Sequence, residues 1–121
     1  ADFERFQRRL LDDLEAGGIA IEATYMCPHL PDARCACRKP EPRSLLDARD
    51  RFAIDLAASW VIGDHAVDVR LAVNAGCGGI LLLTGHGEEE RHKLGDTPVA
   101  AIVADLPAAA RYILTDERSA R

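Results

Sequence analysis

Apolar residues recur at the spacing of an amphipathic helix in two stretches of the chain, with charged residues between them. The first two predicted helices cover residues 2–15 and 44–52, and the apolar stripe of the first is expected to cover a sheet. A third helix is expected to begin near Val67 and to end at Gly76, because glycine is favoured just after the last helical residue. A fourth should begin at Asp105, a residue suited to the N-cap, with Pro107 in its first turn.

Four further stretches have the character of β-strands. Residues 19–25 alternate between apolar and polar side chains, residues 59–62 and 79–83 are continuously apolar, and residues 99–103 form a weaker apolar run. The apolar runs suit strands that are buried on both faces, as parallel strands are. Strands and helices alternate beyond residue 42, so the predicted fold class is α/β, with a parallel, Rossmann-like sheet and flanking helices.

Between the first predicted strand and the second helix lies a loop rich in thiols and proline. The spacing C-x-H-x5-C-x-C places Cys27, His29, Cys35 and Cys37 within it. Three thiolates and an imidazole are a ligand set for a closed, structural zinc site. A disulfide from Cys27 to either later cysteine is the alternative, and free or redox-active thiols are another.

Acidic residues are expected at the carboxyl end of the predicted strand 59–62. The motif Gly63-Asp64-x-x-x-Asp68 spans the turn into the next helix, so both carboxylates can approach one centre. Oxygen ligands of this kind suit magnesium, although Asp68 could instead cap the helix. His86 follows the next strand on the same rim and could contact a ligand there, although a single loop histidine is more often simply exposed.

Length and charge narrow the functional classes. At 121 residues the chain is at most one small domain, and its net charge of −5 argues against a general nucleic-acid or anionic-membrane binder. There is no apolar run of about 20 residues and no signal-peptide pattern, so a cytoplasmic protein is expected. The acidic residues 88–90, followed by Arg91 and Lys93, predict a solvated, partly helical insert.

Two motifs together resemble those of a known superfamily. Cys-x-Cys-Arg-Lys-Pro at the end of the loop, with Gly63-Asp64-x-x-x-Asp68 downstream, resembles the haloacid dehalogenase superfamily of phosphatases, in particular its heptose bisphosphate and histidinol phosphatase branch. The resemblance implies a zinc loop over residues 27–39 and magnesium-assisted hydrolysis of a small sugar phosphate. It also implies that Lys39 neutralises the phosphate, Arg38 binds substrate, Asp64 holds magnesium and Asp68 is the second acid of the motif.

The catalytic nucleophile of such phosphatases is absent from these residues. The resemblance implies an Asp-x-Asp motif after an apolar first strand, but the sequence contains no Asp-x-Asp, and Asp12 and Asp13 are adjacent within a predicted helix. Residues 1–121 therefore resemble a single partial domain, the C-terminal portion of the enzyme, with a sheet incomplete on its N-terminal side. Two expectations follow. In the first, a further segment of the protein or a second copy of the chain completes the sheet. In the second, the chain is a zinc-stabilised, non-catalytic module that binds anions at Arg38 and Lys39.

Overall fold

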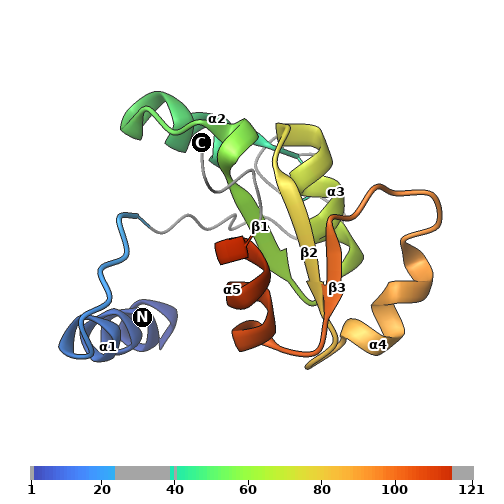
Figure 1. The fold of residues 1–121 in the computed structure, drawn as a ribbon. Helices are drawn as coiled ribbons and strands as arrows, with labels where there is room; N and C mark the ends of the chain where they lie inside the picture. The colour runs from blue at the N-terminus through green and yellow to red at the C-terminus, as the bar shows by residue number, and fades with distance from the viewer. Residues whose placement is uncertain (1, 24–38, 40, 116–121) are drawn as a thin grey trace.

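The architecture is a parallel sheet with helices on both faces (Figure 1). The structure is a computed structural model, and it describes residues 2–23, 39 and 41–115. None of the helices within these ranges has the length and apolar content needed to cross a bilayer. In chain order the elements are α1 (Asp2–Ala16), α2 (Arg43–Phe52), η1 (Leu56–Ala58), β1 (Trp60–Gly63), α3 (Ala66–Ala75), β2 (Gly78–Leu82), α4 (Gly87–Glu90), η2 (Arg91–Lys93), β3 (Ala101–Val103) and α5 (Leu106–Thr115).

The three described strands pair in the order β1-β2-β3, and both pairings are parallel. Ile62 of β1 lies beside Ile80 of β2, which in turn lies beside Ala101 of β3. The predicted α/β class and parallel sheet are therefore confirmed. The last strand is shorter than predicted, because residues 99 and 100 precede the paired segment.

Side chains on the two faces of the sheet pack against different helices. On one face Leu81 is fully buried together with Val69 of α3, and a methyl group added to Gly79 would lie 3.1 Å from Cβ of Ala72. On the other face Trp60 meets Tyr112 of α5, with ring centroids 5.6 Å apart. Helices on both faces account for the continuously apolar strands.

The N-terminal part of the chain departs from the prediction. Helix α1 forms, but it does not cover the sheet, since Phe6 is 67% exposed and Leu10 is 46% exposed. The predicted strand 19–25 is wrong over its described residues: positions 19–23 have no regular structure, and Ile19 and Ile21 are exposed. A strand needs a neighbour to pair its backbone groups, and no described strand lies beside this segment to do so.

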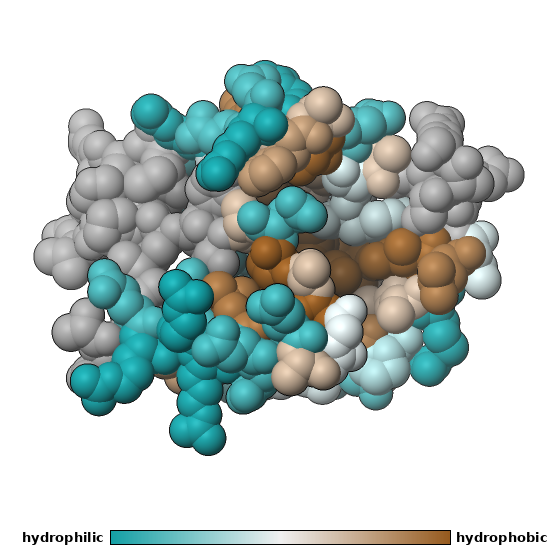
Figure 2. Space-filling view, turned by 90° about the vertical axis from the view of Figure 1, so that its left-hand side faces the viewer, coloured by the Kyte–Doolittle hydropathy of each residue, from teal (hydrophilic) through white to brown (hydrophobic). Residues whose placement is uncertain are grey.

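Apolar side chains are exposed on β1 and on α5. Strand β1 pairs with β2, and no described strand pairs with its other edge. Ile62 on β1 is 36% exposed, and Leu106 and Leu114 of α5 are more exposed still. Figure 2 shows hydrophobic surface across the middle of this side of the molecule. Within the described residues, β1 is therefore an edge strand of the sheet.

The acidic insert is not wholly solvated, because Glu90 is buried. Its Oε1 accepts a hydrogen bond from the backbone N–H of Ala66, at 2.9 Å, and its other oxygen pairs with Lys93. A carboxylate at this position satisfies a free N–H of the first turn of α3 and complements the helix dipole. The ion pair with Lys93, and then the Ala66 hydrogen bond, lower the pKa of Glu90. Glu90 therefore fixes the start of α3.

We predict that Glu90→Gln destabilises the chain at pH 7, because Gln can still accept from Ala66 but carries no charge. The lowered pKa means that wild-type Glu90 contributes stability above its unfolded pKa and loses it as the pH falls through the folded pKa. The unfolding temperature of Glu90→Gln should therefore be lower than that of wild type at pH 7, and the two temperatures should become equal at acidic pH. Glu89→Gln, at an exposed neighbour, should match wild type throughout. An equal deficit for Glu90→Gln at every pH would contradict this account.

Candidate active site at the carboxyl rim of the sheet

The turn between β1 and α3 carries the acidic residues predicted from the sequence. Strand β1 ends at Gly63 and α3 begins at Ala66, so Asp64 and His65 form the turn and Asp68 lies in the first turn of the helix. The loop after β2, which contains His86, adjoins this turn. Parallel strands place their carboxyl ends at one edge of the sheet, where open α/β sheets bind ligands.

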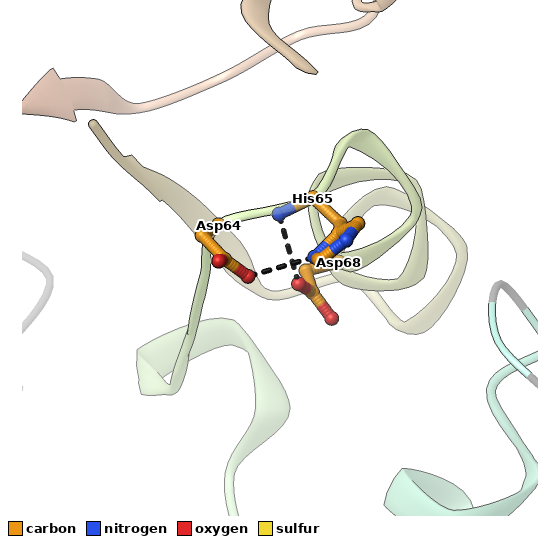
Figure 3. A group of neighbouring side chains, drawn as sticks. All are labelled: Asp64, His65 and Asp68. Carbon is orange, nitrogen blue, oxygen red and sulfur yellow. Dashed lines mark hydrogen bonds and ion pairs between the residues drawn. The ribbon is translucent and has the colours of Figure 1, made fainter. Parts of the chain in front are cut away.

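Asp64 is held by two neighbours and is still accessible. Its Oδ2 accepts a hydrogen bond from the backbone N–H of His86 at 3.1 Å, and its Oδ1 lies 2.7 Å from Nδ1 of His65 (Figure 3). An ionised carboxylate can only accept, so Nδ1 of His65 carries the proton. The His86 N–H, followed by the His65 side chain, lowers the pKa of Asp64. The side chain is 33% exposed, so Asp64 presents an ionised carboxylate to solvent.

Asp68 is buried and engages both of its oxygens. Oδ2 accepts from the backbone N–H of His65 at 3.3 Å, which satisfies a backbone donor at the start of α3 (Figure 3). Oδ1 accepts from Nζ of Lys39 at 2.7 Å, and the side chain of Asp68 is only 8% exposed. A side chain at Gly63 would overlap the carboxylate, so the motif glycine makes room for it. Asp68 therefore both caps the helix and anchors a lysine.

Lys39 is the one predicted phosphate-binding residue that the structure describes, and its side chain remains 57% exposed. The ion pair with Asp68 joins residues 29 positions apart in sequence. It brings a cation to the rim that carries Asp64. Arg38 and the predicted zinc ligands lie outside the described residues and stay predictions; those ligands are Cys27, His29, Cys35 and Cys37.

Three of these side chains are close enough to share a metal ion. Asp64, His65 and Asp68 each offer one ligand atom, and these atoms lie within 4.8 Å of one another. The two carboxylates were expected from their spacing, but His65 was not expected as a ligand. Its imidazole is a donor suited to transition metals, whereas carboxylate oxygens suit magnesium.

The second histidine has a contact that sequence reasoning missed. The side chain of His86 is exposed, as expected, and its ring lies 5.0 Å from that of His65. Its backbone N–H, however, is bonded to Asp64. A contact made by a backbone N–H cannot be predicted from the type of residue. The feature of the sequence that pointed to it was the pair of glycines that flank His86, Gly85 and Gly87.

The sequence of the chain is similar to those of known phosphatases and of a bifunctional histidine biosynthesis protein. A D-glycero-beta-D-manno-heptose-1,7-bisphosphate 7-phosphatase of Bordetella bronchiseptica is 37% identical over 102 residues, covering 84% of this chain and 56% of the relative. The protein of the same name from Escherichia coli K12 is 35% identical and covers 90% of the chain and 61% of the relative. The histidine biosynthesis bifunctional protein HisB of Actinobacillus pleuropneumoniae is 40% identical over 75 residues, which cover 62% of the chain and 21% of the relative.

A solved structure has the same fold. The crystal structure of D,D-heptose 1,7-bisphosphate phosphatase from B. bronchiseptica, complexed with magnesium and phosphate, superposes with a TM-score of 0.82 at 35% identity, covering 93% of this chain and 63% of that one. The chain thus spans between half and two thirds of the length of these phosphatases. Residues 36–109 match the model of the HAD-hydrolase-like family. The resemblance inferred from the motifs is confirmed: this chain belongs to the HAD-hydrolase-like family.

Proposed function

We propose that this chain carries the phosphate- and magnesium-binding part of a phosphoric monoester hydrolase that acts on a heptose bisphosphate. The observation that carries the proposal is the convergence of Lys39, Asp68 and Asp64 on the carboxyl rim of the sheet. The names of the phosphatase relatives and of the phosphate-bound crystal structure support this choice of substrate. Histidinol phosphate is the alternative substrate, because HisB is also similar.

Lys39 is assigned to the phosphate. Its ammonium lies on Asp68 at 2.7 Å but stays more than half exposed, so its remaining N–H groups can face a phosphate oxygen. A cation already held in place stabilises negative charge on a transferring phosphoryl group without reorganising during the reaction. Arg38, the neighbouring residue in sequence, is assigned as a second substrate contact.

Asp64 is assigned to magnesium. Its carboxylate is ionised and partly exposed, and oxygen donors of this kind fit the ion. Bound magnesium neutralises charge on the phosphoryl oxygens. Asp68 was proposed from the sequence as a second ligand, but its side chain is only 8% exposed and its charge is already paired with the ammonium of Lys39. Asp68 is therefore assigned as the residue that positions Lys39.

The nucleophile is proposed to come from outside these 121 residues. A covalent route requires a carboxylate that attacks the phosphorus, and the sequence has no Asp-x-Asp to provide it. The apolar edge of β1 is the proposed place for the strand that carries this motif. On this proposal residues 1–121 are one partial domain, and a further segment of the protein carries the nucleophile. A second copy would pair with the edge of β1 but would bring no Asp-x-Asp.

The thiol-rich loop is proposed to bind one structural zinc ion through Cys27, His29, Cys35 and Cys37. Four protein ligands complete a tetrahedral site, so such an ion stabilises the loop that leads to Lys39 and does not activate water. A cytoplasmic location, where thiols stay reduced, belongs to the same proposal.

A non-catalytic module is the second candidate function. One observation favours it. Lys39, the proposed anion contact, is held in place by Asp68, whereas the sequence has no Asp-x-Asp. Such a module would bind phosphate without hydrolysing an ester.

Lys39→Met should weaken binding of inorganic phosphate by about tenfold to a hundredfold, because a charge-assisted hydrogen bond is worth about 1.5–3 kcal/mol. Titration followed by ³¹P NMR measures the affinity. Arg43→Met is the matched control, because Arg43 is an exposed cation of α2 that pairs with Asp47. Equal affinities for the two variants would remove Lys39 from the phosphate site.

Metal analysis of the purified chain should find about one zinc per molecule. Cys35→Ser should lower the zinc content, whereas Cys77→Ser, at the fourth cysteine of the chain, should leave it unchanged. Zinc-free protein whose Cys27 is found in a disulfide would establish the alternative reading of this loop.

The isolated chain should release no measurable phosphate from a heptose bisphosphate in the presence of magnesium. A chimera that adds the part of the B. bronchiseptica phosphatase that the chain does not cover should release it. Asp64→Asn in the chimera should abolish most of this activity. Turnover by the isolated chain would show that another of its carboxylates is the nucleophile, and turnover of histidinol phosphate alone would select the alternative substrate.

A further inference from the structure

We infer that the turn after β2, residues Thr84, Gly85, His86 and Gly87, positions the carboxylate of Asp64 through its backbone. We call these four residues the β2 turn. The inference rests on the proposed function for its purpose, since Asp64 is the proposed magnesium ligand. The contact itself is a property of the described structure and can be tested without any metal.

The first argument is the close approach of Gly85 to Asp64. Gly85 has φ +60°, a left-handed conformation that costs glycine little and other residues more. A Cβ at this position would also overlap Oδ2 of Asp64. Gly85 is therefore required twice, for the backbone conformation and for the space that the carboxylate occupies.

The second argument is that the β2 turn is fixed at its far end. The backbone N–H of Gly87 donates to the carbonyl of Thr84 at 3.1 Å, and a side chain at Gly87 would overlap the carbonyl oxygen of Leu82. Gly87 is also buried. The turn is thus closed on itself and seated on the end of β2, so it presents the N–H of His86 in a fixed direction.

These constraints determine how Asp64 is oriented. The N–H of His86 holds Oδ2, while His65 holds Oδ1 from the other side. A carboxylate fixed at both oxygens has lost its rotational freedom before a ligand arrives, and preorganisation of this kind strengthens ligand binding. The β2 turn acts through Asp64, so His86 is a positioning residue.

The backbone and the side chain of His86 have different roles in this arrangement. The hydrogen bond to Asp64 uses the main-chain N–H, which every residue except proline provides. The imidazole is exposed and takes no part in this bond. His86→Ala should therefore preserve the position of Asp64, whereas His86→Pro and Gly85→Ala should not.

The first experiment observes the hydrogen bond directly, by ¹H–¹⁵N NMR of the 121-residue chain. The amide proton of residue 86 should resonate downfield in wild type and in His86→Ala, and it should move upfield in Asp64→Ala, where the acceptor is lost. An amide of residue 86 that is unaffected by Asp64→Ala would overturn the inference.

The second experiment measures the affinity of the chain for a divalent metal ion. Mn²⁺ is the probe, and its EPR signal gives the concentration of free ion. Gly85→Ala should lower the Mn²⁺ affinity by about tenfold, the lower end of the range for lost partners of metal ligands. Gly95→Ala is the matched control: Gly95 has a similar φ of +54°, but nothing lies within 4 Å of an added Cβ. His86→Ala should bind Mn²⁺ as wild type does.

Equal Mn²⁺ affinities for Gly85→Ala and Gly95→Ala would overturn the positioning role, provided that both variants give dispersed NMR spectra. Failure of the proposed function is distinguishable from this result. If wild type bound no Mn²⁺ while the residue 86 amide still responded to Asp64→Ala, the assignment of Asp64 to a metal would be wrong, and its positioning by the β2 turn would stand.

Discussion

The buried carboxylate of Asp68 is the constraint on which the rest of the site depends. A carboxylate that is almost removed from water must be compensated by hydrogen bonds and by an opposite charge. The backbone N–H of His65 and the ammonium of Lys39 provide both. Meeting this need caps α3, shapes the turn that carries Asp64, and ties Lys39 to the edge of the sheet.

The two acids of the motif therefore differ in environment and in role. Asp64 is partly exposed and is held by donors that keep it ionised. Asp68 is buried and already neutralised by a lysine. An accessible carboxylate can accept a metal ion, whereas a buried, paired carboxylate is better suited to hold another side chain in place. Glycines allow both arrangements, because Gly63 makes room for Asp68 and Gly85 makes room for Asp64.

Much of the fold could be predicted because its signals are local. The apolar runs at β1 and β2 mark buried parallel strands, and the cap at Asp105 is found, with its Oδ1 accepting from the N–H of Ala108 at 2.9 Å. The motif acids lie together because both belong to the turn from β1 into the first turn of α3. The strand expected at residues 19–25 was wrong over its described part, since alternation cannot show whether a neighbouring strand is present.

The features that escaped prediction are tertiary contacts. Glu90 belongs to an acidic run that is typical of a solvated surface, yet it is buried because it reaches the start of α3. The N–H of His86 contributes to the site through a backbone atom, which no residue pattern encodes. His65 joins the metal-capable group only because the turn after β1 folds it onto Asp64.

The central claim is that Lys39, held by Asp68, binds phosphate beside a metal ion on Asp64. A crystal structure of the chain grown with magnesium and inorganic phosphate would test it most directly. The account predicts phosphate oxygens at about 3 Å from Nζ of Lys39, the ion on Asp64, and the Lys39–Asp68 pair intact. Phosphate bound elsewhere, or Asp68 coordinating the ion with Lys39 displaced, would contradict it.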